Sequence, residues 1–192
     1  MQNAQPLKDF IAAVTRLIEA GTPESELPGE VAEHMKKLIR SRDWLPPEYA
    51  HASGPSYSQY LLYCDPLERF SVVSFVWGPK QQTPIHNHTV WGVIGQLQGS
   101  EMSQSFLPQE SGAPQPVGTP ELMRAGGIAH VAPPDHDVHR VSNPSDTETA
   151  ISIHVYGANI GRLPRTVFDP ATGERSVFIS SYSNAALPNI WM

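Results

Sequence analysis

Apolar residues recur at intervals of three and four positions along the first 45 residues of the chain, and this spacing predicts two helices. The first lies between residues 7 and 18, and Gly21 and Pro23 end it. The second runs from Val31 to about Arg42 and ends at the segment Trp44-Leu45-Pro46-Pro47. We expect both helices to pack their apolar faces on the outside of the core that follows. The apolar face of the first helix contains Leu7, Phe10, Ile11, Val14, Leu17 and Ile18.

From Tyr57 onward the pattern changes to short β-like runs that are separated by turns. The chain has 19 prolines and 14 glycines, as expected of many short strands joined by turns. Residues 108–120, rich in Pro, Gly and Gln, are predicted to be a loop and are the best candidate for a mobile surface segment, and residues 169–173 predict a turn. The fold class expected is therefore an all-β core with N-terminal helices outside it. Strands are expected at residues 60–63, 70–77, 89–97, 150–156 and 176–182.

Length and composition fit one domain that covers residues 1–192, with a helical region at 1–45 and a β-barrel from about residue 57. The 192 residues are 40% hydrophobic and 17% charged, which is typical of a globular enzyme. The net charge of −6 and the absence of a basic run argue against nucleic acid or an anionic membrane as a partner. The sequence shows no apolar run long enough for a bilayer and no signal-peptide pattern at its N-terminus. The single Cys64 cannot form an internal disulfide, so a reducing, cytoplasmic location is expected.

The segment Pro84-Ile85-His86-Asn87-His88 and the later segment Val138-His139-Arg140-Val141 carry the most informative chemistry of the chain. In an extended segment, residues two apart point to the same face, so His86 and His88 would face inward together. His139 could complete the site from a neighbouring strand. Imidazole suits Zn, Cu, Fe and Ni, so the ligand type does not name the metal. The alternative for the isolated H-x-H pair is a coincidence of two surface polar residues.

A second polar pattern lies in the run from Ile151 to Gly157, where Ser152, His154 and Tyr156 would share one face of a strand. Three buried polar groups in line must each find a hydrogen bond. One interpretation is a relay in which Ser152 orients His154 and His154 holds the Tyr156 hydroxyl toward the metal. The alternative is that this face of the strand is exposed to solvent.

The glycines around these histidines have a pattern that resembles the two metal-binding motifs of the cupin superfamily. The first block contains Gly78, His86, His88, Gly92 and Gly99, and the second Gly127, Pro134, His139 and Asn143. This resemblance implies a cupin fold, the double-stranded β-helix or jelly-roll barrel. The first motif usually carries a glutamate ligand where this chain has Gly92, so a neutral three-histidine site is expected.

The combination H-N-H-T-V-W-G, L-Q-G, D-V-H-R-V-S-N and S-I-H-V-Y resembles the cysteine dioxygenase family of thiol dioxygenases. The resemblance covers about residues 57–156. It implies mononuclear non-haem Fe(II) and the oxidation of a small thiol by O₂ to a sulfinic acid. By this resemblance His86, His88 and His139 are the iron ligands, and the outer relay consists of Ser152, His154 and Tyr156.

Two departures from the mammalian type point to a bacterial branch that includes 3-mercaptopropionate dioxygenases. The cysteine that cross-links to the relay tyrosine is replaced by Gly92, and the arginine that holds the substrate carboxylate is replaced by Gln59. In that branch a later arginine binds the carboxylate, and Arg165 is the matching position. Arg162 is the close competitor, and we expect it to be a surface charge. The best substrate is then 3-mercaptopropionate, and cysteine is the alternative.

Other classes of protein remain open at this stage. A three-histidine cupin with Zn or Ni could act as a hydrolase, an isomerase or an acireductone-type dioxygenase, and a non-catalytic cupin could bind a small ligand. The relay favours the thiol dioxygenase over both. His130 and His136 lie near the third ligand and are expected to be loop or structural residues. The partners expected are a small thiol and O₂, and a homo-oligomer is compatible with the sequence.

Overall fold

The computed structural model describes residues 3–134 and 137–191, and two helices precede the β-structure. Helix α1 spans Gln5–Glu19 and α2 spans Leu27–Leu38, followed by a short 3-10 helix, η1, at Pro47–Tyr49. The second helix begins four residues earlier than predicted, because Pro28 lies in its first turn, where a proline costs no hydrogen bond. No helix in these ranges is long and apolar enough to cross a bilayer.

The strands form two antiparallel sheets, as the all-β prediction required. The sheet that we call the helix-backed sheet has the order β1-β2-β9-β4-β7, and the open sheet has the order β11-β10-β3-β8-β5-β6. The helix-backed strands are β1 (Ser58–Cys64), β2 (Ser71–Trp77), β9 (Ala150–Tyr156), β4 (Gly92–Gln98) and β7 (Ile128–Val131). The open-sheet strands are β11 (Arg175–Phe178), β10 (Arg165–Phe168), β3 (Ile85–His86), β8 (His139–Ser142), β5 (Ser100–Leu107) and β6 (Gln115–Arg124).

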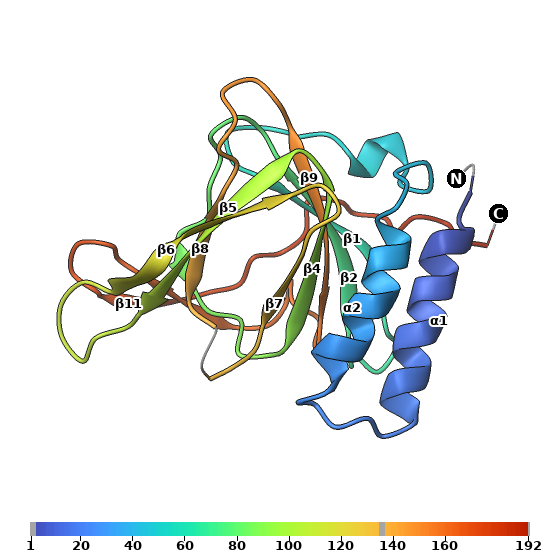
Figure 1. Cartoon of the computed structure of the whole chain (residues 1–192), viewed down its shortest axis with the longest axis horizontal. Helices are drawn as coiled ribbons and strands as arrows, with labels where there is room; N and C mark the ends of the chain where they lie inside the picture. Colours follow the sequence, from blue (N-terminus) through green and yellow to red (C-terminus); the bar gives the residue numbers. More distant parts are fainter. Residues whose placement is uncertain (1–2, 135–136, 192) are drawn as a thin grey trace.

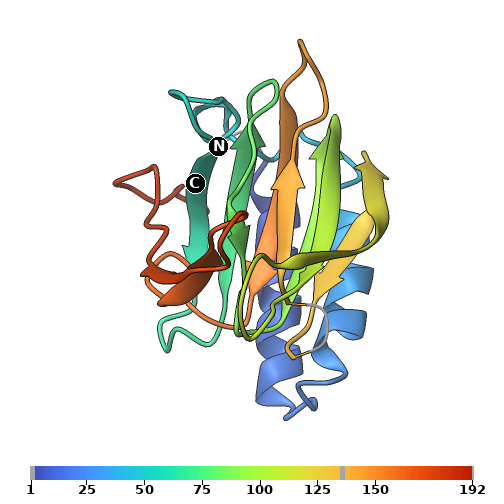
Figure 2. The same ribbon diagram turned by 90° about the vertical axis from the view of Figure 1, so that its left-hand side faces the viewer.

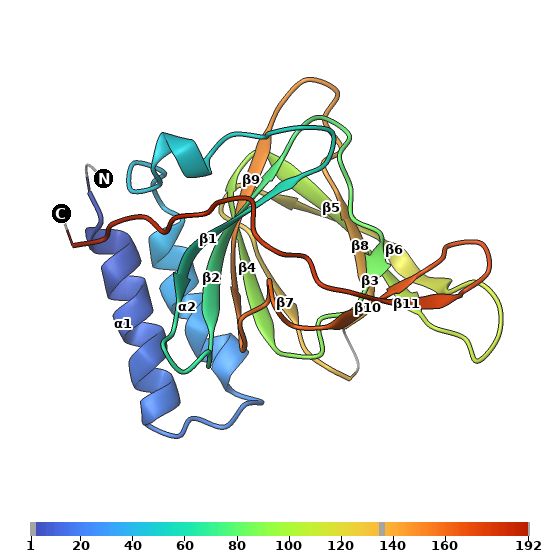
Figure 3. The ribbon, with the colours of Figure 1, turned by 180° about the vertical axis from the view of Figure 1, so that it is seen from behind.

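Helices α1 and α2 cover the face of the helix-backed sheet that is turned away from the open sheet (Figures 1 and 3). Seen from the open sheet, the helices lie behind the strands (Figure 2). Gly95 of β4 allows the close approach of α2, because a Cβ there would lie 2.7 Å from Cγ of Met35. The buried side chains of Leu7, Val14, Val31, Val93 and Ile153 belong to the cluster between helices and sheet.

A second, smaller cluster fills the space between the two sheets and includes Val73, Phe75, Ile94, Val141 and Tyr156. The alternation along β9 explains the division, since Ile151, Ile153 and Val155 face the helices and the residues between them face the barrel interior. The fold is the predicted one, a cupin barrel of two antiparallel sheets with two N-terminal helices outside.

Several predicted boundaries were wrong. The strand expected at 89–97 begins only at Gly92, because Thr89 adopts a left-handed φ of 61° that ends the extended run. The loop expected at 108–120 is a loop only in its first half, since β6 begins at Gln115. That strand is almost wholly exposed, so it lacks the apolar alternation on which the prediction of strands relied. The last expected strand, 176–182, is β11 and ends at Phe178.

Candidate metal and substrate site

Three imidazoles converge between the sheets from separate segments of the chain. His86 lies in β3, His88 follows that strand by two residues, and His139 opens β8 directly opposite His86. One ligand atom from each lies within 4.8 Å of those of the other two. The ring centroids are 4.8 to 5.0 Å apart. The structure therefore brings together the three histidines that the sequence singled out.

His88 faces inward although it lies outside the strand, and Asp137 explains its position. One oxygen of the Asp137 carboxylate accepts a hydrogen bond from the His88 amide at 2.6 Å, and the other accepts one from the Thr89 amide at 3.2 Å. On the other side, Asn87 exchanges hydrogen bonds with the backbone of Thr166 in β10. These contacts fix the turn after β3 and hence the direction of the His88 side chain.

Each of the three imidazoles uses Nδ1 for a hydrogen bond to the protein. The partners are the carbonyl oxygen of Pro84 for His86 at 3.0 Å and the Asp137 carboxylate for His88 at 3.2 Å. Ser103 Oγ lies 3.3 Å from Nδ1 of His139. Such outer partners hold metal-binding imidazoles in one tautomer and orientation, with the lone pair of Nε2 directed at the ion.

Burial lowers the pKa of His86 well below its usual range and that of His139 to about 3, and it also lowers the pKa of His88. The imidazoles are therefore neutral at physiological pH, the form that donates a lone pair to a metal. Three neutral nitrogen ligands in a buried site fit a single transition-metal ion. The donor set does not distinguish iron from the other metals that imidazole suits.

The three polar residues of β9 form a hydrogen-bonded chain beside this site. Ser152 Oγ lies 2.7 Å from Nε2 of His154, and Nδ1 of His154 lies 2.7 Å from the Tyr156 hydroxyl. All three side chains are buried, so the alternative of a solvent-exposed face is wrong. The Tyr156 ring stacks on His88 with a centroid distance of 5.5 Å. The chain of hydrogen bonds thus ends next to one of the three imidazoles.

Arg165 and Gln59 come from opposite sheets and line the same pocket as the histidines. Both side chains are buried and both bind Ser180 Oγ, Arg165 through Nη2 at 2.8 Å and Gln59 through Nε2 at 3.2 Å. The Arg165 guanidinium lies over the Phe178 ring, 4.5 Å from its centroid. By contrast the Arg162 side chain is 78% exposed and lies 3.9 Å from Glu68, as a surface charge should.

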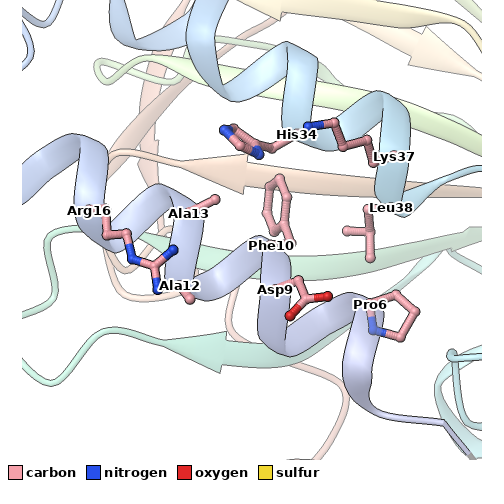
Figure 4. Close-up of a pocket in the computed structure, with 9 residues that line it drawn as sticks. All are labelled: Pro6, Asp9, Phe10, Ala12, Ala13, Arg16, His34, Lys37 and Leu38. Atoms are coloured by element: carbon pink, nitrogen blue, oxygen red, sulfur yellow. The ribbon is translucent and has the colours of Figure 1, made fainter.

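The pocket enclosed by these residues is small, about 20 Å³. Its lining includes the three imidazoles and the aromatic side chains of Tyr57, Phe75 and Trp77, which pack on one another. A larger hollow of about 480 Å³ lies between α1 and α2 and is lined by residues such as Asp9, Arg16 and His34 (Figure 4). It contains no member of the predicted site, and it lies on the outside of the fold.

The other residues that the sequence analysis considered do not belong to the group of metal-binding or substrate-binding side chains. Gly92 lies opposite Tyr156 in the pairing of β4 with β9, and a Cβ at position 92 would lie 2.7 Å from the Tyr156 ring. His130 is exposed in β7, and His136 lies outside the described residues. Cys64 ends β1 with its pKa raised to about 11 by burial, which makes it a poor thiolate.

Sequence reasoning missed four residues that support the site: Glu101, Ser103, Asp137 and Ser180. Asp137 stands in the motif D-V-H-R-V-S-N, but its partner is the distant His88 and not the neighbouring His139, so its role had no local signal. Ser103 and Ser180 had none, since a serine in a polar segment is indistinguishable from any surface serine. Glu101 is 3% exposed and lines a cavity together with His139 and His154.

The barrel, the converging imidazoles and the buried relay define a cupin with a three-histidine metal site. Residues 45–164 match the model of the family described as cysteine dioxygenase type I, which is more than half of the chain. The chain belongs to this family. Membership and the three-histidine site together indicate a thiol dioxygenase that acts on a small molecule.

Solved structures of other cupins are similar to this chain at low sequence identity. An uncharacterized conserved protein with a double-stranded β-helix domain from Klebsiella pneumoniae is 17% identical, with 68% of this chain and 90% of that chain covered and a TM-score of 0.46. A cupin superfamily protein from Desulfitobacterium hafniense is 10% identical, with 57% and 84% covered and a TM-score of 0.43. These similarities concern the barrel and carry no information on substrate.

Proposed function

We propose that this protein is an Fe(II)-dependent thiol dioxygenase of the glutamine-bearing branch, and that it oxidises 3-mercaptopropionate to its sulfinic acid. Both atoms of O₂ end on the sulfur, so the reaction requires no external reductant. His86, His88 and His139 would hold the iron. When bound, the iron would supply the chemistry that ionises the thiol and activates O₂.

The observation that carries the choice of substrate is the state of Arg165. Its guanidinium is buried, its Nε has no hydrogen-bond partner, and no ion pair in residues 3–134 and 137–191 includes it. A buried cation without a counter-ion is unfavourable. A carboxylate of the substrate would supply the missing charge and accept the unused N–H in a planar, charge-assisted contact.

The rest of the pocket favours a thiol acid without an α-amino group. No aspartate or glutamate is among the residues that line the pocket in the described parts of the chain. The ammonium group of cysteine would therefore find no carboxylate there, whereas 3-mercaptopropionate has no such group to place. Gln59 adds a neutral amide, which is already held by Ser180 and by the carbonyl oxygen of Ser181.

The protein's own part in the reaction is to bind, orient and exclude water. Arg165, with the neutral Gln59 beside it in the pocket lining, would hold the carboxylate end of the substrate, so that the sulfur lies toward the imidazoles. Burial raises the pKa of Tyr156 well above its usual range, so its phenol stays protonated. As a neutral group fixed by His154, it can give or accept a hydrogen bond at the sulfur or at dioxygen in the pocket.

The first experiment is oxygen consumption by the Fe(II)-loaded protein with 3-mercaptopropionate, L-cysteine and cysteamine in parallel, with the sulfinate quantified. The highest kcat/KM is expected for 3-mercaptopropionate. A preference for cysteine would support the proposed dioxygenase activity and contradict the choice of 3-mercaptopropionate as substrate. Absence of thiol-dependent uptake at full iron occupancy would favour a different metal, as in Zn or Ni cupins, or a binding role.

Replacing Arg165 by Ala tests the carboxylate contact, with Arg162→Ala as the matched control on the surface. The KM for 3-mercaptopropionate should rise about 10- to 100-fold, which is the size of a lost charge-assisted hydrogen bond. The KM for cysteamine, which has no carboxylate, should change little. The iron content of the variant is measured in parallel. If it is unchanged and the KM rises equally for the two thiols, Arg165 does not bind the substrate carboxylate.

Two sequence-based expectations stay predictions. We propose that residues 1–192 form one cupin domain and that the protein works in the cytoplasm. Limited proteolysis and fractionation of the native host would test them.

A further inference from the structure

The segment after β11, residues 180–184, lies against β1, and we call it the strap (Figure 3). The Ser183 amide donates to the carbonyl oxygen of Gln59 at 2.7 Å, and Ser183 Oγ accepts from the Gln59 amide at 2.9 Å. The side chain of Asn184 binds the backbone amide and the carbonyl oxygen of Leu61 at 2.8 and 2.9 Å. These hydrogen bonds fix the strap beside the strand that carries Gln59.

The strap uses both hydrogens of the Gln59 side-chain amide. Nε2 donates to Ser180 Oγ at 3.2 Å and to the carbonyl oxygen of Ser181 at 3.0 Å. A backbone carbonyl can only accept a hydrogen bond, so the NH₂ group of Gln59, and not its oxygen, must be turned toward the strap. The contact with Ser181 therefore determines the orientation of the amide.

The oxygen of the same amide is left for the pocket. Gln59 is 4% exposed and lines the pocket together with the imidazoles. Within residues 3–134 and 137–191 its Oε1 accepts no hydrogen bond, yet this atom keeps some accessible surface. A buried carbonyl oxygen without a donor is unfavourable. Gln59 thus offers the pocket a hydrogen-bond acceptor that the protein itself does not satisfy.

Ser180 places this acceptor next to the site proposed for the substrate carboxylate. Its hydroxyl oxygen accepts from Nε2 of Gln59 and also from Nη2 of Arg165 at 2.8 Å, so the two head groups share one partner atom. Both lone pairs of the hydroxyl are occupied by these donors. A carboxylate held by Arg165 would bring the adjacent carbon atom of the substrate, C2, close to Gln59.

We propose that Gln59 recognises the substituent at C2 of the substrate, and that a neutral hydrogen-bond donor there, as in 2-hydroxy-3-mercaptopropionate, improves binding. The inference rests on the proposed function, because it concerns the same pocket, and it adds a second recognition contact to that of Arg165. The hydroxyl would donate to Oε1 of Gln59 and bring no charge into the pocket.

The neutrality of the donor matters as much as its hydrogen. The ammonium group of cysteine could donate to the same oxygen, but a neutral carbonyl does not offset a buried charge. Neither aspartate nor glutamate lines the pocket in the parts of the chain that the structure describes. A 2-hydroxy acid would gain the hydrogen bond without this cost.

The contact should also distinguish the two enantiomers of the hydroxy acid. Arg165 and the three imidazoles would fix the carboxylate and the sulfur at the two ends of the substrate, and Gln59 lies to one side of the line between them. The two substituents of C2 then point in different directions, so only one enantiomer directs its hydroxyl at Oε1.

The direct test is calorimetric binding to the full-length protein loaded with Zn(II), which binds thiolates and has no redox chemistry. The ligands are 3-mercaptopropionate, both enantiomers of 2-hydroxy-3-mercaptopropionate, and 2-methyl-3-mercaptopropionate, whose methyl group resembles a hydroxyl in size but donates nothing. One enantiomer of the hydroxy acid should bind about 2- to 10-fold more tightly than 3-mercaptopropionate, the size of one net hydrogen bond. The methyl compound should show no such gain.

Gln59→Met removes the acceptor and keeps the length of the side chain, so the advantage of the hydroxy acid should disappear. Ser183→Ala is the matched control, because that hydroxyl binds the backbone amide of Gln59 and not its side chain. It should retain the advantage. A gain that survives in Gln59→Met would mean that the hydroxyl binds another group, such as the metal, and would overturn the proposal.

Were Gln59→Met to fold poorly, the wild type alone would decide. Equal affinities for both enantiomers and for 3-mercaptopropionate would contradict the contact with Gln59. This readout depends neither on iron nor on O₂. A wild type that binds thiol acids but shows no thiol-dependent oxygen uptake would therefore contradict the proposed dioxygenase function, while the affinities would still decide the role of Gln59.

The same contact should appear in the kinetics of the Fe(II)-loaded protein. Because it is made by the bound substrate and by the transition state alike, the favoured enantiomer should show a lower KM than 3-mercaptopropionate with a similar kcat. A changed kcat with the same KM would place the hydroxyl against the reacting atoms and contradict the proposal.

Discussion

The two sheets of the barrel contribute to the site in different ways. The helix-backed sheet is buried on both faces, and every residue of β2 and β9 is buried. The open sheet is less buried and less regular, since β6 is almost entirely exposed and β3 is only two residues long. His86 and His139 come from the open sheet, whereas Ser152, His154 and Tyr156 come from β9, a fully buried strand of the helix-backed sheet.

This division shows two ways of holding a polar group in place. The relay residues are held by a strand with hydrophobic packing behind it, so that their positions follow from the stability of the whole domain. The three histidines in or next to the open sheet have little packing behind them and depend on local hydrogen bonds with Asp137, Ser103 and the backbone of Pro84. Changes in the open sheet should therefore affect metal binding first, and changes in the helix-backed sheet should affect stability first.

The largest effect is expected for His139→Ala in the open sheet. Loss of one of three ligands should reduce metal affinity by more than the ~10- to 100-fold that loss of an outer partner costs, with little change in the unfolding free energy of the metal-free protein. Metal content after dialysis measures this. His130→Ala, an exposed histidine of the neighbouring β7, is the control and should retain metal. Equal metal content in the two variants would exclude His139 as a ligand.

The second effect concerns the packing face of β9. Ile153 is fully buried between the helix-backed sheet and the helices, and Ile153→Ala should lower the free energy of unfolding by about 2–5 kcal/mol. Val177→Ala in β11 of the open sheet, 77% exposed, should stay within about 0.5 kcal/mol of the wild type. Denaturant titration of both variants compares the two sheets directly, and similar losses would refute the contrast.

The smallest effect is expected at Gly92 of β4, which packs against the Tyr156 ring of the relay. A Cβ at position 92 would overlap the Tyr156 ring and a methyl group of Val131, each at 2.7 Å. Gly92→Ala should cost about 1–3 kcal/mol of stability and move the tyrosine away from its hydrogen bond with His154. Denaturant titration and thiol-dependent oxygen uptake measure the two consequences. A variant with the stability and the rate of the wild type would contradict the expected displacement of the Tyr156 ring.

The sequence determined more of the helix-backed sheet than of the open sheet. Alternation along β9 predicted its bounds, its two faces and the line of Ser152, His154 and Tyr156, because apolar residues face the helices and polar ones face the barrel interior. The exposed β6 leaves no such pattern, and half of it was predicted to be a loop. The three histidines were found by their spacing and by the family motif, with no need for the fold.

Only the tertiary structure decided which polar groups act on one another. Arg165 and Ser180 are 15 residues apart, and Gln59 and Ser180 are 121 apart, yet one serine hydroxyl binds both side chains. Glu101 read as an ordinary glutamate of a polar segment, and its burial follows from the pairing of β5 with β6 and β8. Periodicity records which side chains share a face of a strand or helix, because that depends on local backbone geometry. It does not record which neighbour a buried polar group meets, because that depends on how the two sheets close on each other.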